Sequence, residues 1–344
     1  MPPALVLGSD LEVAEVGRAL LSRGNAVDSV AGAVFAAGAL YPSVLLGPVQ
    51  LLLGGAGAGL RAIDGRPRQP GLGNPRPRGF LPSEAVPPAA RVGVPALPAA
   101  LLAAVTTYGR LSVAAVLAPA VELARAKSKP RAMFLERVSQ RGPAALAEAV
   151  IADELVALAG RLSGGLLSKR DLDELRPVVA TAVFHRSGAR EVACVPWGAA
   201  AVRDPEGTGV AASDARIVVA VDRNGLVAMA SYAVPRDGLA LEVFDLVAPF
   251  SATPVLRSKA RVKPGELRSA PAPMALGRSA GVLDLAVGLG ATADGEAALG
   301  RWLSDYEPAS ELLRDVALPP GLVGAQRAGA GWAELVNPVP LETG

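Results

Sequence analysis

The chain holds very few of the residues from which metal and redox sites are built. Its 344 residues include one cysteine, Cys194, and one histidine, His185. A single cysteine excludes an intramolecular disulfide, and a single histidine excludes a metal site that uses two imidazoles. Aromatic residues make up only 4% of the chain, which leaves few rings to stack on nucleic-acid bases. We expect no metal and no cofactor.

An excess of one charge sign is also lacking. There are 34 Lys and Arg residues against 32 Asp and Glu, a net charge of +2. Such a balance provides no general attraction to nucleic acid or to anionic membranes. The apolar stretch over residues 27–53 is interrupted by Asp28, Pro42, Gly47 and Pro48, so its pieces are far shorter than the ~20 residues of a membrane span. The first residues show no basic and apolar leader pattern. We expect a cytoplasmic protein without nucleic-acid or membrane partners.

What the chain has in quantity is apolar residues, glycine and proline. Hydrophobic residues make up 51% of it, with 38 Gly and 30 Pro. This length and composition can bury a substantial core in one large domain or in two.

The clearest local pattern is a β-hairpin over residues 215–231. Two apolar runs rich in β-branched residues flank the turn Asp-Arg-Asn-Gly at residues 222–225. A second hairpin is predicted where the glycine run 54–59 separates the strand-like segments 49–53 and 60–63. A dinucleotide-binding loop would have to open a helix, but the chain instead reaches Asp-Gly-Arg-Pro at residues 64–67. We interpret the glycine run as a hairpin loop.

Capping patterns predict two helix starts. Asn25 is followed three residues later by Asp28, and Ser168 by Asp171, as in a capping box. After Asn25, one helical face carries only apolar residues: Val27, Val30, Ala31, Val34 and Phe35.

Further elements are predicted from turn residues and periodicity. The segment 92–126 reads as two helices joined by a turn at Tyr-Gly-Arg-Leu, residues 108–111, and another helix is expected over 143–159. Strands at 180–184 and 191–195 are expected to meet at a tight turn near Ser187. The Pro- and Arg-rich segment 64–91 is expected to be a solvated loop on the surface.

Taken in order, these motifs resemble those of the γ-glutamyltranspeptidases. The matching segments are Gly-Asn-Ala-Val-Asp (24–28), Asp-Gly-Arg (64–66), Val-Gly-Val-Pro (92–95), Tyr-Gly-Arg-Leu (108–111), Leu-Ala-Pro-Ala (117–120), Gly-Gly-Leu-Leu-Ser-Lys-Arg-Asp-Leu (164–172) and the hairpin at 215–231. The resemblance implies an α+β fold, the αββα four-layer sandwich of N-terminal-nucleophile hydrolases. The helical insertions of this fold look reduced, because only residues 199–214 stand between the turn at 195–198 and the hairpin, where the family has a long helical insertion.

The resemblance spans residues 1–344 as a single domain. Residues 1–200 resemble the large subunit of the family and residues 210–344 the small subunit. In the family, the chain is cut before a threonine, whose hydroxyl then attacks the γ-amide of the substrate. Laid turn on turn, that threonine falls on Ala215, and Arg216 and Ile217 replace the Thr and His that follow it. A methyl group cannot act as a nucleophile, so we do not expect the two halves to be cleaved apart.

Other polar positions of the family pattern are lost as well. Pro235 falls on the substrate-binding asparagine, Ala248 and Pro249 on the acidic pair, and Ala270 on the second of two serines.

Four positions keep a binding role that the resemblance implies. Arg66 matches the arginine that grips the substrate α-carboxylate, and Ser269 matches the retained serine. The backbone amides of Ala280 and Gly281, in the segment 277–281, match the oxyanion hole.

We therefore hypothesise a non-catalytic pseudoenzyme with a binding or structural role, whose partner is another protein or a second copy of the chain. One alternative is an active amide hydrolase or transferase that uses Ser213, two residues before Ala215 on the same strand face, or Thr208 in the loop 205–209. Another is a carrier that holds a small anionic or γ-glutamyl ligand through Arg66. A catalytic pair of Cys194 and His185 is disfavoured, because these residues are not cross-strand partners.

Overall fold

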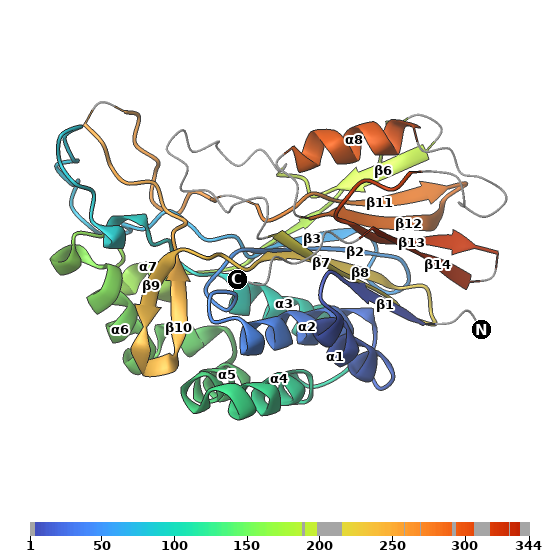
Figure 1. The fold of residues 1–344 in the computed structure, drawn as a ribbon, viewed down its shortest axis with the longest axis horizontal. Helices are drawn as coiled ribbons and strands as arrows, with labels where there is room; N and C mark the ends of the chain where they lie inside the picture. The colour runs from blue at the N-terminus through green and yellow to red at the C-terminus, as the bar shows by residue number, and fades with distance from the viewer. Residues whose placement is uncertain are drawn as a thin grey trace.

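Two six-stranded antiparallel sheets lie face to face in the computed structural model, with helices against their outer faces (Figure 1). The structure describes residues 4–187, 190–197, 215–257, 259–268, 270–290, 294–305, 317–329 and 331–337. The first sheet contains, in spatial order, β1 (Leu5–Gly8), β7 (Ala215–Val221), β8 (Val227–Ala233), β2 (Val49–Gly54), β3 (Arg61–Asp64) and β4 (Val178–Thr181). The second contains β14 (Gly331–Asn337), β13 (Leu322–Ala328), β12 (Val282–Leu289), β11 (Met274–Ser279), β6 (Arg190–Cys194) and β5 (His185–Ser187).

Helices complete the outer layers on both sides. Those on the side of the first sheet are α1 (Leu11–Leu21), α2 (Ala26–Leu40), α3 (Leu97–Tyr108), α4 (Val113–Lys127), α5 (Lys129–Arg141), α6 (Ala149–Ala159) and α7 (Lys169–Asp173). Helix α8 (Gly295–Asp305) covers the outer face of the second sheet. A separate hairpin, β9 (Gly238–Leu241) with β10 (Leu246–Pro249), lies beside α6. The helix–sheet–sheet–helix order confirms the predicted α+β class and its four-layer sandwich.

Three apolar clusters fill the spaces between these layers. The largest joins the helices to the first sheet, a second lies between the two sheets, and a third joins α8 to the second sheet. The cluster between the sheets includes Leu52, Ile217 and Met229 from the first sheet and Met274 and Leu276 from the second, all buried. Each such side chain stabilises the fold by roughly 1.5–3 kcal/mol through burial. Packing of the two sheets is therefore a major part of stability.

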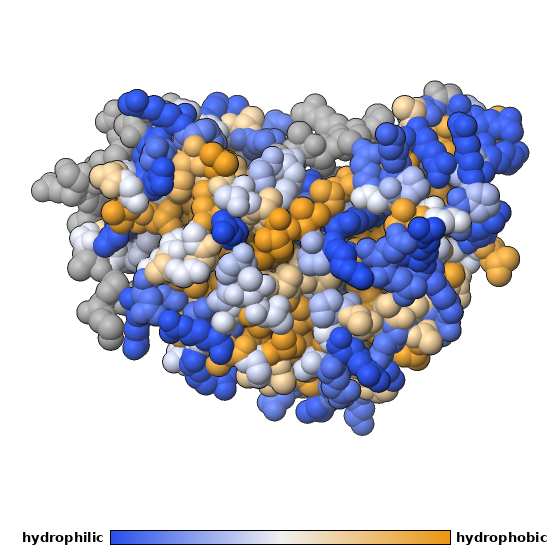
Figure 2. All heavy atoms as spheres, turned by 180° about the vertical axis from the view of Figure 1, so that it is seen from behind, coloured by the Kyte–Doolittle hydropathy of each residue, from blue (hydrophilic) through white to orange (hydrophobic). Residues whose placement is uncertain are grey.

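The surface is less uniform than the core. Figure 2 shows hydrophobic residues gathered in the middle of the face turned away in Figure 1, with hydrophilic residues around the margin. Large hydrophobic side chains that are exposed include Leu11, Leu162 and Val183. In the described part of the chain, no helix is both long and apolar enough to cross a bilayer.

One buried carboxylate, that of Asp28, connects two of the sequence motifs. Asn25 caps α2 by accepting hydrogen bonds from the amides of Val27 and Asp28, and the Asn25 amide donates to Asp28 Oδ2 at 2.9 Å, which confirms the predicted capping box. Asp28 also accepts from the amides of Arg110 and Leu111, in the turn between α3 and α4. The motifs at 24–28 and 108–111 are therefore two halves of one contact.

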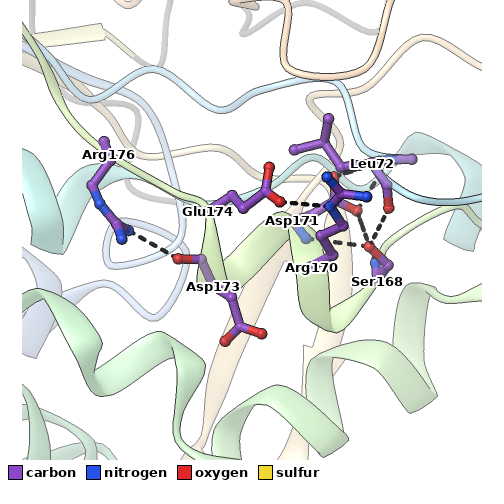
Figure 3. Close-up of polar contacts among 8 residues, drawn as sticks. Leu72, Ser168, Arg170, Asp171, Asp173, Glu174 and Arg176 are labelled. Carbon is purple, nitrogen blue, oxygen red and sulfur yellow. Dashed lines mark hydrogen bonds and ion pairs between the residues drawn. The ribbon is translucent and has the colours of Figure 1, made fainter.

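Asp171 makes a similar connection at the start of α7 (Figure 3). Its carboxylate accepts from the amide of Ser168, completing the predicted capping box, and from the amides of Gly71 and Leu72. The Ser168 hydroxyl lies 2.8 Å from Asp171 Oδ2 and 2.9 Å from the Leu72 carbonyl oxygen. These bonds hold the Pro- and Arg-rich segment against the helical layer.

The beginning of that segment differs from the sequence prediction. Residues 64–70 are mostly buried, with Asp64 1% and Gln69 1% exposed, because they pass between the segments 91–94 and 251–268. Arg68 exchanges backbone hydrogen bonds with Val94, and the Gln69 side chain bonds both backbone polar groups of Thr253. The prediction of a solvated loop is wrong for these residues.

Two element predictions are also corrected. Residues 180–184 do not form one strand, because the chain leaves the first sheet at Thr181 and enters the second at His185. Helix α5 was not predicted, and the helix expected over 143–159 begins only at Ala149 after a 3₁₀ turn. The hairpin at 54–59 and the hairpin of β7 and β8 are confirmed by antiparallel pairing.

We predict that Asp171→Asn lowers the free energy of unfolding by about 2–3 kcal/mol, because an amide nitrogen would face buried N–H donors. Asp173→Asn is the matched control two residues along the same helix, where the side chain is exposed; it should change stability by less than about 0.5 kcal/mol. Urea unfolding measures both. Equal effects of the two substitutions would contradict the role of Asp171.

Candidate functional site

Ala215, at the predicted nucleophile position, is the first residue of β7, between β1 and β8. Its side chain belongs to the cluster between the sheets and is 3% exposed. The loop after β12 approaches it closely, since a Cβ added to Gly290 would lie only 2.8 Å from the Ala215 carbonyl oxygen. The expected nucleophile position is thus occupied by a buried methyl group. Ser213, Thr208 and Ser269 lie outside the described residues.

The glycines beside Ala215 are not those that the sequence indicated. A Cβ added to Gly288 would meet the Ile217 side chain at 2.7 Å, so residues 288–290 lie against the start of β7. Ala280 and Gly281 instead form the turn between β11 and β12, at the other end of β12 and ~20 Å along the strand. The structure therefore places Ala280 and Gly281 away from Ala215, while Gly288 and Gly290 lie beside the start of β7.

Arg66 forms an ion pair with Asp64 of the same chain. It is 3% exposed, and its Nε and Nη2 atoms donate to Asp64 Oδ2 at 2.9 and 2.7 Å. Asp64 Oδ1 also accepts from the Arg66 amide at 2.9 Å. A guanidinium that already forks onto a buried carboxylate has little positive charge left for a ligand. The guanidinium that was predicted to bind a substrate α-carboxylate therefore already binds the Asp64 carboxylate.

Two further arginines in the same group of loops, Arg68 and Arg268, also bond within the protein. Burial lowers the pKa of Arg68, whose Nη2 donates to the carbonyl oxygen of Arg176. Arg268 is 3% exposed and donates from Nε to the Ser251 carbonyl oxygen at 3.2 Å. Both side chains bond backbone oxygens and thereby hold the loops together.

The other substituted positions bring no polar side chain. Ala248 and Pro249 lie buried in β10, where Pro249 pairs with Gly238 of β9. Pro235 follows the end of β8 and is partly buried.

Two polar residues of the inter-sheet face were missed by the sequence analysis. Gln50 of β2 and Ser231 of β8 are cross-strand partners, in a row that also contains Ile217 and Asp64. Both are 0% exposed. Gln50 Oε1, Gln50 Nε2 and Ser231 Oγ have no hydrogen-bond partner in the part of the chain that the structure describes. The available signal was Gln50 itself, the single polar residue in the apolar strand 49–53.

Buried polar groups without a hydrogen-bond partner lower the stability of the folded state. An unsatisfied buried amide or hydroxyl destabilises a protein by about 1–3 kcal/mol, so native structures rarely hold them without a functional reason. This neighbouring pair, on the first and second strands beside β7, is the strongest polar feature of this site. It offers the two N–H donors and the acceptor oxygen of Gln50, together with the Ser231 hydroxyl, which can donate or accept, toward the space between the sheets.

Arg216 lies on the opposite face of the first sheet, which is covered by the helices. It pairs across the strands with the buried Tyr232 and donates from Nη1 to the Ala215 carbonyl oxygen at 3.0 Å. Nearby, Asp10 accepts a hydrogen bond of 2.6 Å from the Tyr41 hydroxyl. Burial, together with Asp10, raises the pKa of Tyr41 to about 12. This cluster packs on the helical side of the first sheet, at the end of β7 that begins with Ala215, and it makes the Tyr41 hydroxyl harder to ionise.

Cys194 and His185 form no catalytic pair. Cys194 pairs with Ala275 of β11, whereas His185 pairs with Val192. Burial raises the pKa of Cys194 to about 11, so the thiol is not a ready nucleophile. Over the described ranges, no group of three or more His, Cys, Asp and Glu residues could hold a metal ion.

We predict that Gln50→Leu raises the free energy of unfolding by about 1–2 kcal/mol, because it removes two orphaned polar atoms. Gln69→Leu is the matched control, since Gln69 is equally buried but bonds Thr253 through both amide atoms. That change should lower stability by about 1–3 kcal/mol. Chemical denaturation of both variants tests the contrast, and a loss of stability in Gln50→Leu would mean that Gln50 is satisfied in solution.

Comparison with known proteins shows likeness in structure alone. No protein-family model and no curated protein matches the chain. Cephalosporin acylase from Bacillus halodurans superposes with a TM-score of 0.65 at 16% identity, over 83% of this chain and 77% of that one. A structure named LmbA2991HD gives a TM-score of 0.71 at 13% identity, over 92% of this chain and 83% of that one. A γ-glutamyltranspeptidase from Helicobacter pylori gives 0.46 at 19% identity, over 54% and 68%. With its layer order and strand topology, the chain has the αββα fold of the N-terminal-nucleophile hydrolases.

Proposed function

We propose that this chain is an uncleaved, non-catalytic binding protein built on a hydrolase fold. The observation that carries the proposal is the buried methyl group of Ala215 at the start of β7. A γ-glutamyltranspeptidase needs a hydroxyl nucleophile at that place. Loss of such a group costs roughly 10⁶ in turnover where catalytic groups act as a unit.

The surroundings of Ala215 support the same proposal. Arg66 is bound to Asp64, and Ala248 and Pro249 provide no carboxylate. Gln50 and Ser231 are buried polar residues of the inter-sheet face without a hydrogen-bond partner among the described residues. They suit recognition better than bond cleavage, because an amide and an unactivated hydroxyl are poor nucleophiles without an adjacent base.

The ligand that these two residues fit best carries a carboxamide. The Gln50 side chain has one acceptor and two donors, so it can pair with another primary amide through two hydrogen bonds, and the Ser231 hydroxyl can add a third. Glutamine and γ-glutamyl compounds have this chemistry. We propose them as the ligand class, with recognition of the amide replacing the arginine grip that the sequence indicated.

The first test is the intact mass of the purified protein. The proposal predicts a single species at 34.8 kDa and no turnover of a γ-glutamyl anilide. Two fragments, with a new N-terminus at Ser213 or Thr208, would overturn it. Turnover that disappears in Ser213→Ala would assign the activity to that serine instead.

The second test is thermal stabilisation by ligand. Glutamine should raise the midpoint of unfolding in a concentration-dependent manner, because it binds only the folded state, whereas glutamate should do so at least tenfold less effectively. Gln50→Leu should abolish the glutamine effect. Gln140→Leu, which changes an exposed glutamine on α5, should retain it. Equal responses of the two variants, or no response of the unmodified protein, would refute an amide site at Gln50.

A further inference from the structure

A cleft opens between the sheets at the end remote from Ala215. Its volume is about 450 Å³, within the range of about 300–1,000 Å³ that is typical of small-molecule sites. The chain crosses from β4 to β5 here and contributes Val183 and Phe184. Its lining includes Gly54, Leu60, Val183, Phe184, Arg278 and Leu283.

One wall of this cleft is aliphatic. Leu60 follows the loop between β2 and β3, and Leu283 lies near the start of β12. Val183 is 72% exposed, an unusual position for a side chain that lines a concave surface. A Cβ added to Gly54 would meet the Leu276 and Leu283 side chains at 2.7 and 2.9 Å, so these leucines pack closely against the Gly54 backbone. Apolar surface is therefore open to solvent in a recess.

The opposite side of the cleft presents one fixed guanidinium. Arg278 Cζ lies 4.0 Å from the centroid of the Phe184 ring, and Arg278 Nε donates to Glu191 Oε2 at 2.6 Å. Its terminal nitrogens have no hydrogen-bond partner among the residues that the structure describes. The ring and the carboxylate hold the side chain from two sides, so little rotamer entropy remains to be lost when an anion binds.

The charge around the cleft favours an anion. The Arg278 hydrogen bond, with help from Arg186, lowers the pKa of Glu191, so this carboxylate is ionised at neutral pH. Arg61 lies behind Leu60 and donates to its carbonyl oxygen. Arg278, Arg186 and Arg61 outnumber Glu191, and the neighbouring Asp284 is paired with Arg190. A positive local charge therefore remains beside the aliphatic wall.

We propose that this cleft binds a small amphipathic carboxylate. The carboxylate group pairs with the terminal nitrogens of Arg278, and the apolar part lies against Leu60, Val183 and Leu283. The site is independent of the amide site at Gln50, because it lies at the opposite end of the inter-sheet layer and shares no residue with it.

Calorimetric titration of the full chain tests this proposal with octanoate as the probe. Octanoate should bind saturably, and octanamide and acetate at least tenfold more weakly, because one lacks the charge and the other the apolar chain. Arg278→Gln should bring the affinity for octanoate down to that for octanamide. Absence of saturable binding, or a preference for octanoate that survives in Arg278→Gln, would overturn the proposal.

A matched pair of exposed valines controls for general charge effects. Val183→Glu places a negative charge in the cleft and should weaken octanoate binding at least tenfold. Val150→Glu makes the same change on α6, where the side chain is 41% exposed, and should leave binding unchanged within twofold. Both residues are exposed, so both variants should fold, which equal thermal midpoints would verify. Equal octanoate affinities of the two variants would also overturn the proposal.

Discussion

Face-to-face packing of the two sheets is the interaction on which the rest of this molecule depends. The cluster that includes Leu52, Ile217, Met229 and Leu276 brings strands from both halves of the chain into one layer. It sets the start of β7 against the loop at Gly290 and opens the cleft near Gly54 at the other end. Each proposed site thus lies at an end of the same apolar layer, where packing gives way to polar groups.

Two buried carboxylates give the family-like motifs a structural role that is independent of any chemistry. Asp28 joins the start of α2 to the turn after α3, and Asp171 joins α7 to the segment at Gly71. Each accepts several backbone amides that have no other means of satisfaction, so replacing it would leave several donors unpaired. By contrast, the hydroxyl of a nucleophile does not have to satisfy several backbone amides. These motifs can therefore be kept for structural reasons that do not depend on which residue stands at position 215.

The buried polar side chains of this protein differ in how they are satisfied. Asp64 and Arg66 neutralise each other, and Gln69 is fully bonded to Thr253. Gln50 and Ser231 are as deeply buried, but they lack partners within the described ranges. Stability alone would favour apolar residues at both positions, since an orphaned amide costs free energy. Retention of such groups is typical of sites that trade stability for recognition.

The sequence by itself determined the local elements whose signals are local. The hairpin of β7 and β8, the capping boxes at Asn25 and Ser168, and the glycine hairpin at 54–59 follow from turn chemistry and periodicity within a few residues. Contacts between distant segments were decided only by the tertiary structure. Arg66 has the same side chain whether it faces solvent or Asp64, and only strand register shows that Gly290, and not Gly281, meets Ala215. Gln50 likewise becomes an orphaned group only when β8 and the second sheet enclose it, because burial is a property of the assembled layers.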